Sequence, residues 1–119
     1  MTFTKIDHVQ LAMPPAREYE ARQFFCGLLG MKELPKPPEL AKRGGCWFAS
    51  GDVQIHLGIE KDFRPAKKAH PALVCTDYDA LTEGLQEAGI ETIADENNPG
   101  VTRCYICDPF GNRLELIRA

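Results

Sequence analysis

The chain contains only three histidines and one tryptophan among its 119 residues, and it has no long hydrophobic run. No apolar stretch approaches the roughly 18 residues that cross a bilayer, and no signal peptide opens the chain. The net charge of −3 offers no basic surface for nucleic acid or for an anionic membrane. We therefore expect a single soluble, cytoplasmic protein, whose 44% hydrophobic content suffices for a buried core.

The five cysteines are an odd number, which does not favour a framework of disulfides, and we expect reduced thiols. Cys104 and Cys107 form a C-x-x-C pattern. On a strand, however, a spacing of three points two side chains to opposite faces, so this pair cannot share a metal ion. No helix follows the pattern, as it would in a redox motif. We interpret all five cysteines as small, buried, apolar residues.

The sequence predicts the order strand, helix, strand, strand, strand twice. The first half has strands at 5–13, 31–34, 45–50 and 53–58, with a helix at 17–29. The second half has strands at 70–76 and 90–94, a helix at 77–88, started by a capping box of Thr76 and Asp79, and a closing hairpin within 104–117. A charged segment at 60–69 links the halves. This repeat of about 60 residues predicts an α+β fold of two βαβββ modules, about 1–60 and 68–119.

Four polar residues occupy equivalent positions of the two halves. His8 corresponds to His70 at the start of each first strand, and His56 corresponds to Glu115 in each last strand. Each lies on the strand face opposite the apolar stripe that a helix would cover. If the helices lie on the outer side and the sheets form a cup, these four side chains line it. Imidazoles with a carboxylate suit a divalent transition metal, namely Zn, Ni, Co, Mn or Fe(II).

Five motifs in the chain resemble the vicinal oxygen chelate superfamily, the group of glyoxalase, bleomycin-resistance protein and extradiol dioxygenase. The motifs are Ile6-Asp7-His8-Val9, Phe24-Phe25-x-x-Leu28-Leu29-Gly30-Met31, Ile55-His56-Leu57, Ala69-His70 and Asp108-Pro109-x-Gly111-Asn112-x-Leu114-Glu115-Leu116. The resemblance implies paired βαβββ modules around a metal ion, often completed across a homodimer. It also implies a two-His, one-Glu ligand set of His8, His70 and Glu115, with His56 where glyoxalase I enzymes often have a glutamate.

The family resemblance leaves several functions open, because one fold hosts many activities. The first is a glyoxalase-like lyase or isomerase, in which a metal chelates vicinal oxygens of a small substrate and Glu115 assists proton transfer. Ala12 and Glu60 occupy positions that anchor glutathione in such enzymes, so we expect another substrate. The alternatives are a non-catalytic bleomycin-resistance-type binding protein, a fosfomycin-type thiol transferase and a dioxygenase. Gln10 disfavours the transferase, the chain length disfavours the dioxygenase, and the full ligand set disfavours the binding protein.

The same strand alternation predicts which side chains contact a substrate. The candidates that share the concave face with the ligands are Gln10, Trp47, Gln54, Arg103, Tyr105 and Arg113. Arg103 could bind a carboxylate or phosphate through its guanidinium fork. For Trp47 and Tyr105, core or dimer packing is an equally good interpretation. The expected partners are thus a small-molecule substrate and, from the resemblance alone, a second copy of the chain.

Overall fold

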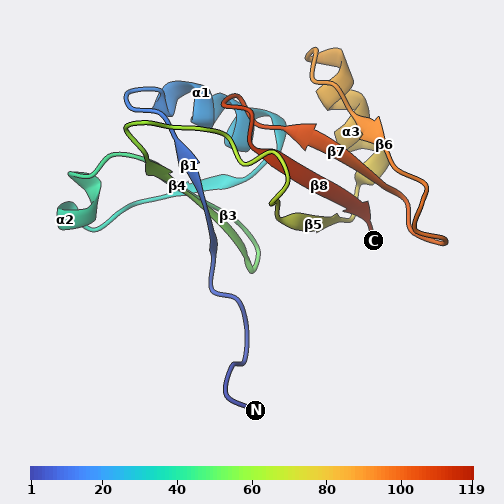
Figure 1. Ribbon diagram of the computed structural model, residues 1–119, viewed down its shortest axis with the longest axis horizontal. Coiled ribbons are helices and arrows are strands. Elements are labelled where there is room, and N and C mark those ends of the chain that lie inside the picture. Colours follow the sequence, from blue (N-terminus) through green and yellow to red (C-terminus); the bar gives the residue numbers. More distant parts are fainter. The chain divides into compact units, whose positions relative to one another are not determined.

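Two four-stranded sheets, one in each half of the chain, form the framework of the computed structural model (Figure 1). The structure describes residues 1–119, which separate into unit 1, Met1–Arg64, and unit 2, Pro65–Ala119. Both units have the order strand, helix, strand, strand, strand, with one additional short helix in unit 1. The predicted α+β class with two βαβββ modules is therefore confirmed. None of the helices has the length and apolar character needed to cross a membrane.

Unit 1 has its strands in the spatial order β1-β4-β3-β2. Strand β1 is parallel to β4, and the other neighbours are antiparallel. The elements in chain order are β1 (Val9–Met13), α1 (Glu18–Arg22), the π-helix η1 (Gln23–Leu28), β2 (Lys32–Leu34), α2 (Pro38–Ala41), β3 (Cys46–Ser50) and β4 (Val53–Ile59).

Unit 2 repeats this arrangement with the order β5-β8-β7-β6, in which β5 is parallel to β8. Its elements are β5 (Ala72–Cys75), α3 (Tyr78–Glu87), β6 (Ile93–Ala94), β7 (Arg103–Cys107) and β8 (Arg113–Arg118). The helix α3 packs against β8 (Figure 1). It begins after Asp77 without any side-chain cap, so the capping box expected of Thr76 and Asp79 is wrong. Asp79 instead pairs with Arg118.

The two units share the same strand register at the predicted equivalent positions. In unit 1, His56 of β4 lies opposite Gln10 of β1 and Trp47 of β3. In unit 2, Glu115 of β8 lies opposite Ala72 of β5 and Tyr105 of β7. Gln10 and Ala72 each follow a histidine by two residues, so the alignment of the halves holds residue by residue.

The core of each unit lies on the sheet face opposite these polar positions. In unit 1, Phe25 and Phe48 stack with their ring centroids 5.1 Å apart, and both are fully buried. Phe24 and Phe25, adjacent in sequence, are both buried where the predicted helix 17–29 changes from α1 to the π-helix η1. In unit 2, Leu114 and Leu116 are buried at the positions flanking Glu115, as strand alternation requires.

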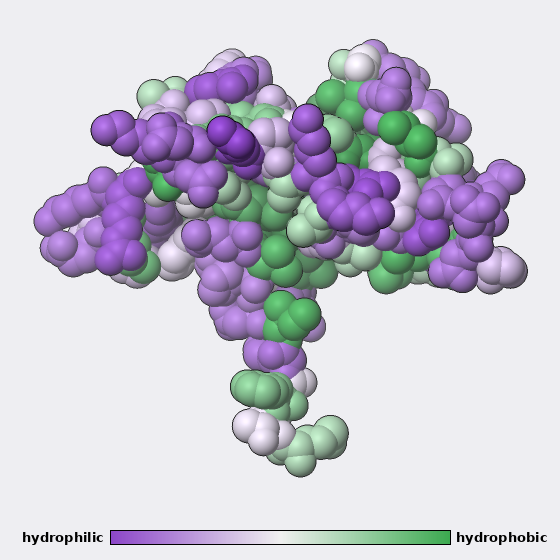
Figure 2. Space-filling model, in the orientation of Figure 1, coloured by the Kyte–Doolittle hydropathy of each residue, from purple (hydrophilic) through white to green (hydrophobic).

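The first strand of each unit is shorter than the sequence predicted. Strand β1 begins at Val9 rather than at residue 5, and β5 begins at Ala72 rather than at residue 70. The hairpin turn between β3 and β4 lies near residues 51–52, so most of the segment before β1 has no strand to pair with. The residues before Asp7 run away from unit 1 as an arm that exposes Phe3 and Ile6 (Figures 1 and 2).

The proline-rich segment after β2 contains the short helix α2, which begins at Pro38, a residue well suited to the first helical turn. All five cysteines are free thiols, but the expectation that all five are buried is wrong: Cys26 and Cys75 are half-buried, and Cys107 is exposed. Cys104 is buried, so the two members of the C-x-x-C pattern do lie on opposite faces of β7.

A tight turn between β7 and β8 fixes the register that places Glu115. The buried Asp108 accepts hydrogen bonds at Oδ1 from the backbone nitrogens of Phe110 and Asn112, at 2.9 and 2.8 Å. Its Oδ2 accepts from the Asn112 side-chain amide at 2.8 Å. Burial raises the pKa of Asp108, and these hydrogen bonds oppose that rise. The sequence Asp-Pro-Phe-Gly-Asn thus forms a closed polar network inside unit 2.

Candidate metal-binding site

The candidate ligands of unit 2, His70 and Glu115, are in direct contact. Nε2 of His70 lies 2.9 Å from Oε1 of Glu115, whose side chain is only 7% exposed. The other ring nitrogen, Nδ1, donates to the carbonyl oxygen of Lys68 at 2.9 Å. Because a carbonyl can only accept, Nδ1 carries the hydrogen and Nε2 is directed at Glu115. A metal-ligating histidine likewise has its outer nitrogen held by an acceptor, whereas Nε2 of His70 here makes a hydrogen bond to Glu115.

The second oxygen of Glu115 is held by Arg103. Nη1 of Arg103 donates to Oε2 of Glu115 at 3.2 Å, and Nη2 lies 3.2 Å from Oδ2 of Asp95. Nε of Arg103 is buried without a partner. Both terminal nitrogens therefore already face carboxylates, so a substrate acid at Arg103 would compete with Glu115 and Asp95. The substrate role of Arg103 stays a prediction.

Tyr105 lies between this pair and a second arginine. The His70 and Tyr105 rings meet edge to face, with centroids 5.3 Å apart. The guanidinium carbon of Arg113 lies over the Tyr105 ring, 3.8 Å from its centroid. Arg113 forms no ion pair with a carboxylate.

The candidate ligands of unit 1, His8 and His56, form a stack with Trp47. The His8 and His56 rings have centroids 3.9 Å apart, and those of His56 and Trp47 are 4.5 Å apart, with an interplanar angle of 13° in both pairs. Asp7 Oδ2 accepts from Nδ1 of His8 at 2.9 Å, and Gln54 Oε1 accepts from Nε2 of His56 at 3.1 Å. Each histidine therefore has one ring nitrogen bound to an acceptor and the other left for a ligand.

The electrostatic setting of His56 favours its neutral imidazole form. Burial lowers the pKa of His56, and the neighbouring His8 adds to the effect. The hydrogen bond from His8 lowers the pKa of Asp7, which keeps that carboxylate ionised and able to accept. A histidine binds a metal ion in its neutral form, so the donor chemistry of His56 fits a transition metal.

A cavity of about 560 Å³ opens beside the stack, and the three remaining predicted residues of unit 1 line it. They are Gln10, Trp47 and Gln54. Gln10 lies across the backbone of Gly58, where a Cβ atom would come within 2.5 Å of its amide nitrogen. Strand β4 therefore requires a glycine opposite β1 for Gln10 to keep this position.

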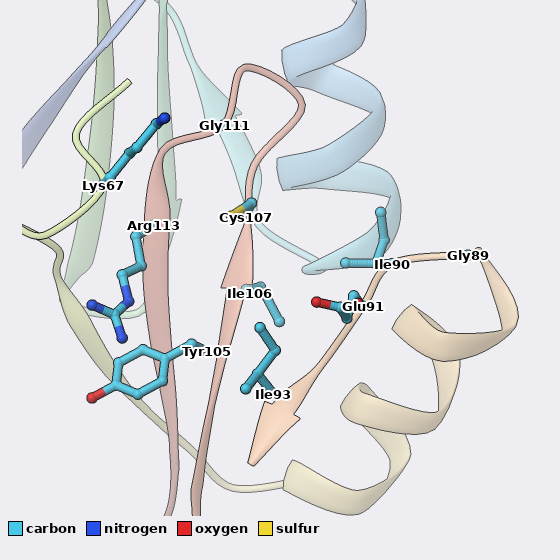
Figure 3. Close-up of a pocket in the computed structure, with 10 residues that line it drawn as sticks. All are labelled: Lys67, Gly89, Ile90, Glu91, Ile93, Tyr105, Ile106, Cys107, Gly111 and Arg113. Carbon is cyan, nitrogen blue, oxygen red and sulfur yellow. The ribbon is translucent and has the colours of Figure 1, made fainter. Parts of the chain in front are cut away.

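A second cavity, of about 460 Å³, lies in unit 2 at the edge of β7 (Figure 3). Tyr105 and Arg113 lie on one side of β7, and Ile93 and Ile106 lie on the other (Figure 3). Neither His70 nor Glu115 lines it. The cavity is therefore separate from the candidate ligand pair, although Tyr105 contributes to both.

The structure thus places the four predicted ligands as two pairs, His8 with His56 in unit 1 and His70 with Glu115 in unit 2. No group of three or more His, Cys, Asp or Glu side chains is arranged to hold a metal ion. Metal binding by these residues stays a prediction. The sequence interpretation missed Asp95, the second partner of Arg103, and two cations at the unit 1 cavity, Lys36 and Arg43. They lie in loops and beside a short helix, where no periodic pattern marks them.

The chain is an α+β protein of two βαβββ units. Each unit has a histidine just before its first strand and a polar residue, His56 or Glu115, in its last strand. These features define the class of protein. The model of the Glyoxalase/Bleomycin resistance protein/Dioxygenase superfamily matches residues 5–116. The chain belongs to this superfamily. Proteins of the group act on or bind small molecules, and the membership alone does not select among their activities.

Solved structures similar to the chain span different functions. A Bacillus anthracis protein assigned to the glyoxalase family is 49% identical, with a TM-score of 0.96, and 99% of this chain covers 97% of that chain. The fosfomycin resistance protein FosX from Listeria monocytogenes is 15% identical (TM-score 0.77; 99% and 95% covered). TnmS3, an antibiotic binding protein from Streptomyces, is 22% identical (TM-score 0.75; 99% and 98% covered). The last two show the fold alone. No curated protein matches the chain.

Proposed function

We propose that the protein is a metal-dependent, glyoxalase-like enzyme that acts on a small molecule with two neighbouring oxygens. His8, His56, His70 and Glu115 would hold a divalent transition metal, Zn, Ni, Co, Mn or Fe(II). The reaction class is that of a lyase or isomerase, in which a proton moves at the carbon beside a carbonyl group. Because the ligands come in two pairs, the proposal includes a homodimer as one way to combine them.

One observation carries this proposal: every candidate histidine has one ring nitrogen bound to an acceptor. The acceptors are Asp7 for His8, Gln54 for His56 and the Lys68 carbonyl for His70. Structural histidines need no such uniform arrangement, whereas metal-ligating histidines almost always show it. All three histidines of the chain and the buried Glu115 also occupy matching registers of the two units.

When bound, a divalent metal would polarise the two substrate oxygens as a Lewis acid. The chain's own residues would do the rest. Glu115 would accept the proton at Oε1, the oxygen that now faces His70, while Arg103 holds Oε2. Gln10, Gln54 and Trp47, which line the unit 1 cavity, would orient the substrate through amide and ring contacts. Tyr105 of unit 2 would add a ring contact.

The test is the metal content of the purified protein, measured by mass spectrometry beside three variants. We expect about one transition-metal ion per set of four ligands. His70→Ala and Glu115→Ala should lose the metal, whereas Glu83→Ala, an exposed acid on α3, should keep it. Metal-loaded protein should then be assayed with 2-oxoaldehydes and with activated epoxides. Absence of metal after reconstitution with Ni, Zn, Mn and Fe(II) would reject the proposal.

A mixture of two double variants tests whether the two ligand pairs of one metal site come from one chain or from two. One double variant is His8→Ala with His56→Ala, and the other is His70→Ala with Glu115→Ala. Each double variant, measured by itself, should bind no metal. If the pairs meet across two chains, a refolded mixture should regain metal in the hybrid dimer. If they meet within one chain, the mixture should stay empty.

A second candidate is a binding protein without catalysis. The observation that favours it is the stack of Trp47, His56 and His8, which offers an aromatic wall to a planar ligand. This candidate is supported if no metal binds and a planar ligand still changes the fluorescence of Trp47, the only tryptophan of the chain.

A further inference from the structure

The cavity of unit 1 is lined by two cations that form no ion pair with an acid. Lys36 and Arg43 both line it, and neither forms an ion pair. The nearby Lys42 differs, because it pairs with Glu39 at 3.0 Å and does not line the cavity. The only acid in the lining is Asp7, whose carboxylate is bound to His8. The cavity is therefore positively biased in a protein whose net charge is −3.

The position of Lys36 is set by its surroundings. Its Nζ donates to the carbonyl oxygen of Gly44 and lies over the Trp47 ring, 5.9 Å from the centroid. Gly44 and Gly45 have φ angles of +75° and +83°, which bring the chain after α2 back against β4. A Cβ atom on Gly45 would lie 2.1 Å from the carbonyl oxygen of Leu57. Two glycines thus fix the loop that holds the ammonium group beside Trp47.

The cavity joins these cations to the candidate metal ligands. His8 and His56 line the same space, with Trp47 stacked on His56. A ligand could therefore place one end at the imidazoles and an anionic end at Lys36 and Arg43. A volume of about 560 Å³ is within the usual range for sites of small organic ligands. In unit 2, by contrast, Arg103 is already bound to Glu115 and Asp95.

We infer that the substrate is an organic anion, whose carboxylate or phosphate group binds Lys36 and Arg43 while its neighbouring oxygens face His8 and His56. The placement of the neighbouring oxygens at His8 and His56 rests on the proposed function, whereas the binding of an anionic group by Lys36 and Arg43 does not. The anion subsite itself needs no metal. It can therefore be tested on protein treated with EDTA, independently of the metal content.

The first test uses Trp47 as the reporter of local charge. Iodide and caesium quench tryptophan fluorescence as an anion and a cation, and acrylamide quenches without charge. We expect the ratio of iodide to caesium quenching, each normalised to acrylamide, to fall about twofold or more in Lys36→Met and in Arg43→Met. Lys42→Met, which removes an equal charge outside the cavity, should leave the ratio unchanged. Equal effects in all three variants would overturn the inference.

The second test compares an acid with its uncharged ester. Benzoylformate and methyl benzoylformate share a phenyl ring and vicinal oxygens, and inorganic phosphate tests the other anion chemistry. We expect benzoylformate to bind at least about tenfold more tightly than the ester, which corresponds to about 1.4 kcal/mol. The double variant Lys36→Met with Arg43→Met should remove this preference. Tighter binding of phosphate than of benzoylformate would assign the subsite to phosphorylated substrates.

Three results would overturn the inference: equal binding of acid and ester, a preference that survives in the double variant, or no binding of either anion. Circular dichroism of each variant confirms folding, and Arg43→Met is the safer change because its side chain is exposed. A protein that prefers anions but binds no metal keeps this inference and loses the proposed function. A protein that binds metal but does not discriminate the acid from the ester keeps the proposed function and loses this inference.

Discussion

Exchanging Asp108 and Asn112 tests the turn that positions Glu115. In Asp108→Asn, the new carbonyl oxygen can still accept from the nitrogens of Phe110 and Asn112. The new amide, however, replaces Oδ2 and meets the Asn112 amide, which was 2.8 Å away. Two donors then face each other at residues that are 5% and 2% exposed.

The expected loss of stability in Asp108→Asn combines two opposing contributions, a lost hydrogen bond and the removal of a buried charge. Losing a charge-assisted hydrogen bond and leaving the new amide of position 108 without an acceptor costs about 2 to 4 kcal/mol. Burial raises the pKa of Asp108, so removing its charge returns part of this cost. We expect Asp108→Asn to lower the free energy of unfolding by about 2 kcal/mol at pH 7. Asn112→Asp should cost more, because it places two carboxylates in contact.

The double variant, Asp108→Asn with Asn112→Asp, should restore the network. The amide introduced at position 108 could donate to one oxygen of the carboxylate introduced at position 112. The other oxygen of that carboxylate could accept from the nitrogen of Ala66, now bound to Asn112 Oδ1 at 3.3 Å. We expect the double variant to be at least about 1 kcal/mol more stable than Asp108→Asn, and the double-mutant cycle to give a favourable coupling energy between the two positions. Urea unfolding followed by circular dichroism gives the four stabilities. A double variant no more stable than Asp108→Asn would refute the reasoning.

Two further predictions concern stability. Gly45→Ala should cost more than about 3 kcal/mol, because it combines a φ of +83° with a Cβ atom 2.1 Å from the Leu57 oxygen. Gly51→Ala, with a φ of +56° and open space, should cost only about 1 kcal/mol in the same urea titration, and equal costs would contradict the clash. Burial raises the pKa of Cys46 from 9.0 to about 11, so the folded state holds this proton more tightly than the unfolded chain. The resulting stability is fully present below pH 9 and is lost as the pH rises through 11, by about 3 kcal/mol in total. Wild type should therefore lose more stability than Cys46→Ala between about pH 8 and pH 11, and parallel losses would contradict this.

Local sequence patterns were sufficient to predict the repeat and the faces of its strands. Strand alternation placed His56 and Trp47 on one face, and Glu115 and Tyr105 on the equivalent face of unit 2, because a period of two depends only on neighbouring residues. The same patterns overestimated β1, since the end of a strand depends on where its partner ends.

The partners of the charged side chains could not be predicted from local patterns. Arg103 contacts Asp95 because the loop between β6 and β7 brings Asp95 beside it. Lys36 lies at the cavity because Gly44 and Gly45 turn the chain back toward β4. Neither path is visible as a periodicity. Long-range geometry of this kind decides which cations are neutralised and which are left for a ligand.

The two units have the same strand register but differ in the charge of the residue at the shared position of the last strand. This difference suits different roles in the proposed site. The last strand of unit 2 carries a carboxylate at the shared position, and an arginine offsets it. The last strand of unit 1 carries a histidine there, stacked on Trp47, and its cavity contains two unpaired cations. A carboxylate at position 56 would lie in the same cavity as Lys36 and Arg43 and would neutralise part of their charge. In the proposed site, His56 would therefore provide an imidazole ligand at this position and would leave both cations available to the proposed anionic substrate.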